Sequence, residues 1–250
     1  MSRLFPVSVI LVFGLATAGC AASGGPGTTS VVVSETPSPT ARATQEPSPG
    51  PTPSPTPEEC PPMAGAAIGA NQTVLATANI YGAGHEYGPA PGGGGRGTLP
   101  PVWELPSGAG FVTISCAVGR VNPIRDNGIW NGAAGDGVGR TEVEAFEGIS
   151  GIVHGRNGMF LVGVFLTDAT PVDPAPPFLD FTATETFDEL APEIGQTFFV
   201  GDGLGRKFLV PAGATRLFLG FADAALYVGP PGWYGNNVGQ LDVTVEVTVG

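Results

Sequence analysis

The nine residues before the final glycine alternate strictly between apolar and polar side chains. Leu241 is followed at every second position by a valine, up to Val249, and Asp, Thr and Glu residues occupy the positions between. A period of two places the apolar side chains on one face of an extended, half-buried strand. Similar alternation occurs in FVTISCAV, which begins at Phe111, and in TRLFLGFA, which begins at Thr215. The chain is therefore expected to be rich in β-strands.

Glycine and proline are too frequent for a mainly helical protein. The 250 residues include 40 glycines and 26 prolines, which favour turns. No strand pattern alternates with long amphipathic helices, so an α/β fold is excluded, and no internal repeat indicates a propeller or solenoid. We expect one all-β domain over residues 61–250, with helical turns at most near residues 142–147 and 186–190. Further strands are expected at residues 73–80, 159–166, 179–182, 198–200 and 207–210.

The N-terminus resembles the signal of a bacterial lipoprotein. Residues 1–19 contain one arginine and an apolar stretch too short and interrupted to span a bilayer, and small residues lead directly to Cys20. This order is similar to a lipobox, whose cysteine is lipid-modified, for example with palmitate. Cys20 is therefore the expected lipidation site, which would anchor the protein to the membrane of a bacterial cell envelope. The alternative is an ordinary secretory signal in which Cys20 is incidental.

Residues 20–60 have the composition of a tether. They are mostly Ser, Thr, Pro, Gly and Ala, and prolines recur from Pro47 to Pro57. Such a segment cannot bury a core, so it is predicted to be a disordered linker. The prolines enforce an extended path of about 3 Å per residue, which gives that stretch a length of roughly 30 Å. The tether is expected to present the domain beyond the membrane.

Cys60 and Cys116 remain once Cys20 is assigned to lipid. Two cysteines in an exported protein favour a disulfide, which here would attach the end of the linker to the domain. Cys116 lies on the apolar face of its alternating segment and is expected to point toward the core. The alternative is a pair of buried free thiols.

Charge and motifs exclude several classes of function. The chain has 22 acidic and 10 basic side chains, so it lacks the basic surplus that nucleic-acid phosphates require. No HExxH motif occurs, GISGI around Ser150 lacks the last glycine of a nucleophile elbow, and His85 and His154 are expected to be solvated loop residues. The run GGGGRG at residues 92–97 is predicted to be a flexible loop, because no helix follows it. The protein is therefore expected to have no enzymatic activity.

The segment between the last two clear strands holds a candidate cation site. The first strand ends at Asp223 and the second begins near Gln240, so an antiparallel hairpin would bring Asp223 close to Asn236 and Asn237. One carboxylate and two carboxamide oxygens suit Ca²⁺, which takes six to eight oxygen ligands. The alternative is that Asp and Asn only form turn hydrogen bonds with their own backbone.

The segment from Pro211 to Val249 resembles the C-terminal half of PA-IL-like calcium-dependent galactose-binding lectins. The resemblance is carried by Asp223 at the end of one strand and by the sequence Tyr-Gly-Asn-Asn, from Tyr234, before the last strand. It implies a jelly-roll β-sandwich of the galactose-binding-domain-like type. It also implies that calcium is held by Asp223, Asn236 and Asn237, by the Trp233 carbonyl, and by a carbonyl after the strand at 111–119, from Val121, Asn122 or Pro123. Of these three, Asn122 is the assigned ligand.

In that family calcium binds both the protein and a sugar diol, which implies a carbohydrate-binding role for Asp223, Trp233, Asn236 and Asn237. The family's sugar-contacting His and Gln fall near Glu147 and Ser150, so a galactose preference does not carry over. The expected function is calcium-dependent carbohydrate binding by a surface lipoprotein. The alternative is a structural or adhesive envelope module in which calcium only stabilises the loop. Two other carboxylate sites receive less weight: a hydrolase cleft built from Glu142, Glu144 or Glu147, and a cation site at Asp202.

Overall fold

In the computed structural model of the chain, the described residues are 60, 68–125, 127–137 and 140–250. The predicted signal peptide, the Cys20 lipidation site and the linker as far as residue 59 lie outside them. The described part is all-β, with several sheets and no α-helix. Its helical elements are three short 3-10 turns, η1 (Ile80–Gly82), η2 (Ala225–Tyr227) and η3 (Tyr234–Asn236).

The largest sheet has five strands in the order β1-β15-β3-β12-β10. Their bounds are β1 (Ile68–Leu75), β15 (Val238–Val249), β3 (Ala109–Asn122), β12 (Lys207–Leu209) and β10 (Glu189–Leu190). The alternating C-terminal segment forms β15, which pairs antiparallel with β1 on one side and β3 on the other. Leu241, Val243 and Val245 are fully buried, as their period of two predicts.

A second sheet of four strands has the order β11-β8-β13-β2. These strands are β11 (Phe198–Phe199), β8 (Leu161–Leu166), β13 (Arg216–Phe221) and β2 (Val102–Glu104). All six residues of β8 are buried, which fits the apolar run predicted as a central strand. The ring of Phe198 lies 4.9 Å from the ring of Phe208 on β12, centroid to centroid. The first two sheets therefore contact each other through aromatic side chains.

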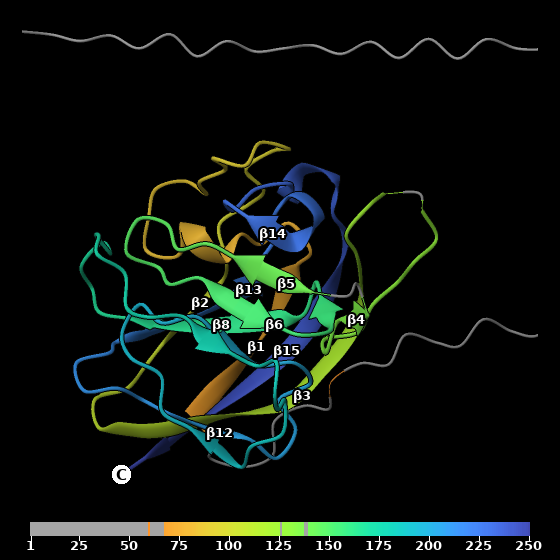
Figure 1. Cartoon of the computed structure of the whole chain (residues 1–250). Helices are drawn as coiled ribbons and strands as arrows, with labels where there is room; N and C mark the ends of the chain where they lie inside the picture. The colour runs from red at the N-terminus through yellow and green to blue at the C-terminus, as the bar shows by residue number, and fades with distance from the viewer. Residues whose placement is uncertain (1–59, 61–67, 126, 138–139) are drawn as a thin grey trace, which may run out of the picture. The chain divides into compact units, whose positions relative to one another are not determined.

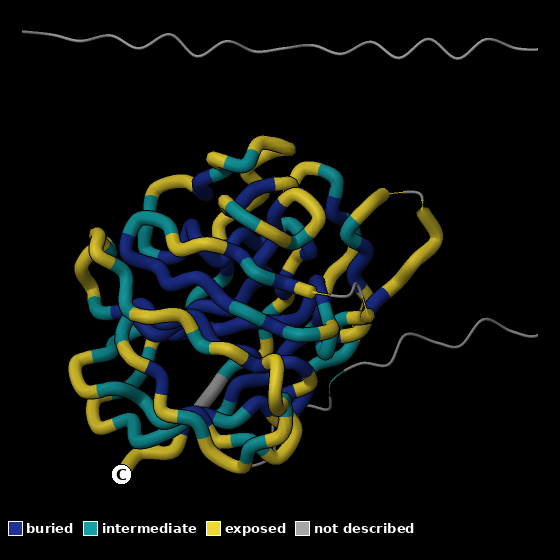
Figure 2. The backbone as a smooth tube through the Cα atoms, viewed as in Figure 1, coloured by how far each residue is buried: buried dark blue, intermediate teal, exposed yellow. Residues whose placement is uncertain are grey.

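The remaining strands form two small sheets. One has the order β14-β5-β6-β9, with β14 (Val228–Gly229), β5 (Thr141–Val143), β6 (Ile152–His154) and β9 (Leu179–Asp180). The other pairs β4 (Asp136–Gly137) with β7 (Asn157–Gly158). In Figure 1, β14 lies at the opposite end of the molecule from the C-terminus. Figure 2 shows that the buried backbone is concentrated in the strands, and that exposed segments surround them.

The prediction of the all-β class and of most strands is confirmed, but the helical turns expected near residues 142–147 and 186–190 are absent from these described segments. The segment at 142–147 begins within β5, and the segment at 186–190 ends in β10. In β5 the side chains of Thr141 and Val143 are buried and that of Glu142 is partly exposed, so the local period is two rather than that of a helix. The strand expected at 73–80 ends at Leu75 and is followed by η1.

The predicted hairpin between the last two strands is wrong. β13 pairs with β8 and β2, whereas β15 pairs with β1 and β3 in the other large sheet. Both edges of β15 are already occupied, so β13 has no free edge there with which to pair. Residues 222–237 thus connect two different sheets.

A disulfide joins Cys60 to Cys116, as predicted, with their Cα atoms 5.7 Å apart. Cys116 is 8% exposed and lies on β3 opposite Thr244 of β15. The last residue of the predicted linker is therefore attached to the central strands of the largest sheet.

Candidate functional site

Asp223 lies two residues beyond the end of β13, and its side chain is only 3% exposed. Its Oδ1 accepts a hydrogen bond from the Ala224 N–H at 2.8 Å, and its Oδ2 accepts one from Asn237 Nδ2 at 2.9 Å. Burial raises the pKa of this carboxyl to about 7, although both hydrogen bonds act in the opposite direction. A buried carboxyl group with a raised pKa and no basic side chain at its oxygens is a strong candidate for binding a cation or a polar ligand.

Of the two predicted asparagines, Asn236 ends η3 and Asn237 precedes β15, and Asn237 contacts Asp223 directly. Asn237 is 2% exposed, and its Nδ2 also donates to the Ala76 carbonyl at 3.2 Å. The Oδ1 atoms of Asn236 and Asn237 are both buried without a hydrogen-bond partner. Burying an unpaired carboxamide oxygen is unfavourable, so Asp223 and these two asparagines, which the Asn237 hydrogen bond and a shared cavity wall bring together, form an incomplete polar cluster. The prediction that Asp223 and Asn237 lie together is confirmed, although the hairpin invoked to explain it does not exist.

The end of β3 forms the third side of this cluster. The Arg125 N–H donates to the Asn236 carbonyl at 2.9 Å, which holds the 122–125 turn against η3. Asn122 is 1% exposed, and its Oδ1 accepts the Ile124 N–H at 2.8 Å. This is the turn hydrogen bond weighed as the alternative to a ligand role for asparagine. The side-chain oxygen of Asn122 is therefore already engaged in the turn next to Asn236, which leaves its carbonyl as the predicted ligand.

Trp233 and Tyr234 have different roles. Tyr234 is fully buried, and its hydroxyl accepts the Asp223 N–H at 3.1 Å and donates to the Phe221 carbonyl at 2.9 Å. It therefore holds the backbone that carries the carboxylate. Trp233 is 42% exposed, and its Nε1 donates to the Gly92 carbonyl at 3.1 Å. Of the two aromatic residues, only Trp233 offers surface to a ligand.

The glycine run at 92–97 is a loop, as predicted, but it also supports the site, which the sequence did not indicate. The Trp233 N–H donates to the Gly93 carbonyl at 2.8 Å, and the Gly235 N–H donates to the Gly94 carbonyl at 3.0 Å. A Cβ atom on Gly94 would lie 2.6 Å from the Trp233 ring. The absence of side chains thus lets this loop pack directly against the backbone of 233–235.

A cavity of about 290 Å³ opens beside the carboxylate, and we call it the Asp223 cavity. Its walls come from the 122–125 turn, from η2 and from η3. It is lined by Pro123, Ile124, Asp223, Ala224, Ala225, Leu226, Tyr227, Trp233 and Asn236. Three segments that are distant in sequence therefore converge on one concave surface that contains three of the predicted ligands, Asp223, Trp233 and Asn236.

The donor set fits calcium in chemical type. Asp223 supplies a carboxylate, and Asn236 and Asn237 supply two buried oxygens that lack a partner. In the structure Asn237 presents its nitrogen to Asp223, so its amide would have to rotate to present Oδ1 to a shared cation. No three His, Cys, Asp or Glu side chains lie close enough to hold a metal ion within the described part of the chain. A site here thus depends on carboxamide and backbone oxygens, which suit calcium better than zinc.

The prediction that His154 is solvated is wrong. Its side chain has no exposed surface, and its ring packs 4.9 Å from Phe160, centroid to centroid. Its Nδ1 accepts the Arg156 and Asn157 N–H groups at 3.2 and 3.0 Å, and burial is the largest cause of the lowering of its pKa. His154 is thus part of the core. His85 is mostly buried as well, with Nε2 3.1 Å from the Glu147 carbonyl oxygen.

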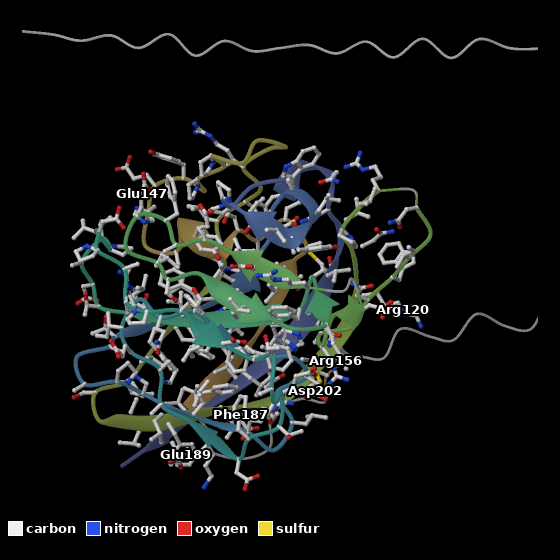
Figure 3. The ribbon with its side chains drawn as sticks, viewed as in Figure 1. Arg120, Glu147, Arg156, Phe187, Glu189 and Asp202 are labelled. Atoms are coloured by element: carbon white, nitrogen blue, oxygen red, sulfur yellow. A yellow bond between two sulfur atoms is a disulfide. The ribbon has the colours of Figure 1, made fainter. Side chains whose placement is uncertain are left out.

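The other carboxylate candidates lie apart from the Asp223 cavity. Asp202 pairs with Arg206 at 3.2 Å, and Figure 3 shows it in the lower half of the molecule, near Arg156 and Phe187. Glu142 and Glu144 line a separate cavity of about 270 Å³, where Glu142 forms an ion pair with Arg140. Glu147 is on neither cavity wall and lies beside His85.

Sequence reasoning missed the residues of η2. Leu226 and Tyr227 line the Asp223 cavity with left-handed backbone angles, φ 52° and 62°. The available signal was the length of the insertion between Asp223 and Trp233, which exceeds that of the lectin motif. Nothing in the local sequence indicates that this insertion folds back over the carboxylate.

Comparisons with family models, curated proteins and solved structures found no match to this chain. The described residues include no helix that is both long and apolar enough to span a membrane.

Proposed function

We propose that residues 61–250 form a non-catalytic, calcium-dependent carbohydrate-binding domain with the jelly-roll β-sandwich fold of PA-IL-like lectins. The observation that carries this proposal is the placement of the Asp223 carboxylate, which accepts a hydrogen bond from Asn237, on the wall of an open cavity that Asn236 shares, with the side-chain oxygens of both asparagines buried and unpaired. The contact between the two large sheets through Phe198 and Phe208 supports the sandwich.

In this proposal, Asp223, Asn236 and Asn237 bind calcium through side-chain oxygens, and Trp233 and Asn122 contribute backbone carbonyls. Those five ligands leave part of the usual coordination number of six to eight for two vicinal hydroxyls of a sugar. Calcium supplies the direct bond to those hydroxyls. Trp233, half-exposed at the rim, is placed to pack against the apolar face of the ring.

The absence of catalysis in this proposal is supported by the structural roles of the residues that could react. Ser150 is fully buried, and its hydroxyl donates to the Gly151 carbonyl and accepts the Thr197 N–H. His154 accepts two backbone N–H groups in the core. Neither residue is accessible to a substrate.

We further propose that Cys20 carries a lipid that anchors the protein in a bacterial envelope, outside the cytoplasm, with the proline-rich tether holding the domain away from the membrane. The basis is the sequence of residues 1–60, in which small residues precede Cys20 and a proline-rich segment follows. Metabolic labelling with a palmitate analogue would show incorporation in the natural protein and none in Cys20→Ala.

The proposed binding can be tested by calorimetry of the purified protein with calcium, with chelator, and with a panel of monosaccharides. Calcium should bind weakly alone, sugar should bind only with calcium, and Asp223→Ala should abolish both. Asp202→Ala removes a carboxyl group that does not line the Asp223 cavity and is the matched control. Calcium binding that persists in Asp223→Ala would show that the site is elsewhere. Calcium binding without any sugar response would favour the structural envelope module.

A further inference from the structure

The walls of the Asp223 cavity are mostly apolar. Of the nine residues that line it, only Asp223 and Asn236 carry charged or amide side chains, and none is basic. The other seven are two alanines, a proline, Tyr227, whose ring carries one hydroxyl, and three large apolar side chains at Ile124, Leu226 and Trp233. A ligand that fills this cavity must therefore place most of its surface against carbon atoms.

Much of this apolar wall projects from the insertion after Asp223. Leu226 is 91% exposed at a left-handed backbone position, φ 52°. Ile124, on the opposite turn, is 53% exposed. Exposed side chains of this size contribute little to the core, and a leucine in the left-handed region costs backbone energy. Their placement around one cavity is explained if they contact a ligand.

An unmodified hexose suits these walls poorly. It carries hydroxyl groups on almost every carbon, and each hydroxyl buried against an apolar wall loses its hydrogen bonds to water without replacement. A uronic acid suits them less, because its carboxylate would take the place of the hydroxymethyl group against the apolar wall, where no basic residue can pair with it. A methyl group in place of the hydroxymethyl group removes one of these unpaired hydroxyls and adds apolar contact.

We propose that the Asp223 cavity accepts the methyl group of a 6-deoxyhexose, with the ring hydroxyls directed to the Asp223 and Asn236 end. This inference rests on the proposed carbohydrate binding and identifies the class of sugar. The apolar wall of η2 sets the preference for the methyl group, and the oxygen cluster binds the diol.

The test uses pairs of sugars that differ only in this group, each titrated calorimetrically in calcium. The pairs are D-fucose with D-galactose, L-fucose with L-galactose, and L-rhamnose with L-mannose. In at least one pair, the 6-deoxy sugar should bind at least about fourfold more tightly, the factor that corresponds to burying one methyl-sized group. N-acetylglucosamine and N-acetylgalactosamine test whether the cavity instead accepts an acetamido group.

Leu226→Asn tests the wall itself. The side chain is almost fully exposed and asparagine tolerates a positive φ, so the fold should be unaffected. The variant should lose the preference for the 6-deoxy sugar, because a hydroxyl can then be paired. Leu204→Asn changes another exposed leucine, outside the cavity, and should keep the preference.

Each outcome bears on a different statement. Equal affinities within every pair, in calcium, would overturn the inference while leaving the proposed function intact. A stronger response to the acetamido sugars, or an unchanged preference in Leu226→Asn, would also overturn it. If no sugar binds in calcium, both the inference and the proposed function are wrong.

Discussion

The Asp223 carboxyl is buried with two hydrogen bonds and no basic partner at its oxygens, and its pKa is raised to about 7. The unfolded chain holds this group near its ordinary value of 3.8, so between pH 4 and 7 the folded protein binds the extra proton. Stability contributed by the neutral carboxyl is therefore complete below pH 4 and is lost as the pH rises through 7.

Asp223→Asn should remove this pH dependence in chelator. The variant and the natural protein should be similarly stable near pH 4, and the variant should be more stable above pH 7, by up to about 4 kcal/mol for a shift of about three pKa units. Urea unfolding at pH 4.5, 6 and 7.5 would measure the difference. Parallel stability curves for the two proteins would contradict the burial of a titrating Asp223. Added calcium should reverse the order above pH 7, because only the aspartate can pair with the cation.

The sequence predicted which residues form the polar cluster at Asp223 better than it predicted the environment of individual side chains. Asp223, Asn236 and Asn237 could be selected because oxygen-bearing side chains flank strand ends, where chain segments converge. The burial of His154 could not be predicted, since its local context, GIVHGRNG, reads as a loop. Its environment is set by Phe160 and Phe199, which come from other elements.

Among the elements, the glycine loop at 92–97 makes the most specific structural contribution to the site. Gly97 has φ 70°, and a Cβ there would overlap the Thr77 carbonyl oxygen and lie 2.6 Å from Tyr234 Cβ. Gly93 has a similar φ of 82°, but its Cβ would meet nothing within 4 Å. The two glycines thus share the backbone requirement and differ only in available space.

Gly97→Ala should therefore destabilise the domain more than Gly93→Ala. Both substitutions pay about 1 to 2 kcal/mol for a left-handed alanine, and Gly97→Ala adds about 1 to 3 kcal/mol for the overlap with Tyr234 and Thr77. Calcium affinity should fall in Gly97→Ala alone, because Tyr234 holds the Asp223 backbone. Denaturant unfolding and calcium titration of both variants measure these effects. Equal losses would indicate that the loop does not support the site.

The strands could be predicted from the sequence because a period of two is visible within each segment. The pairing of strands could not, because it depends on segments that are distant in the chain. The alternation in β15 and β13 gives the same signal whether the two strands form a hairpin or belong to different sheets. β13 and β15 belong to different sheets because β1 and β3 pair with the two edges of β15. Both partners are distant from β15 in the sequence, so the local pattern does not reveal them. For the same reason, β5 and β10 were mistaken for helical turns, since each has only two or three residues and is defined by its partners.

At the scale of the whole molecule, the disulfide connects the tether to the core. Cys60 and Cys116 are 56 residues apart in sequence, and in the chain-entropy model closing a loop of this length stabilises the fold by about 4 kcal/mol. Reduction of the natural protein, and Cys60→Ser without reductant, should lower the free energy of unfolding by similar amounts. Guanidinium unfolding with and without reductant measures both. A stability unchanged by reduction would show that the linkage restrains only the linker.

The proposed tether would determine which glycans the domain can reach from the cell surface. Deleting residues 47–57 removes the proline-rich stretch, for which the sequence predicts a length of roughly 30 Å at about 3 Å per residue, and leaves Cys60 and every residue of the site in the chain. The purified protein should keep its affinity for free sugar, because the deletion removes neither the residues that line the Asp223 cavity nor the glycine loop that supports it. Cells that display the shortened protein should capture fewer glycan-coated beads at equal surface density, since the domain would be held nearer the envelope.

A second variant replaces residues 47–57 by a Gly/Ser segment of equal length. This variant keeps the number of residues but has a shorter average extension, so it tests whether the stiffness of the proline-rich stretch matters. Equal capture by all three forms would rule out a presenting role for the tether.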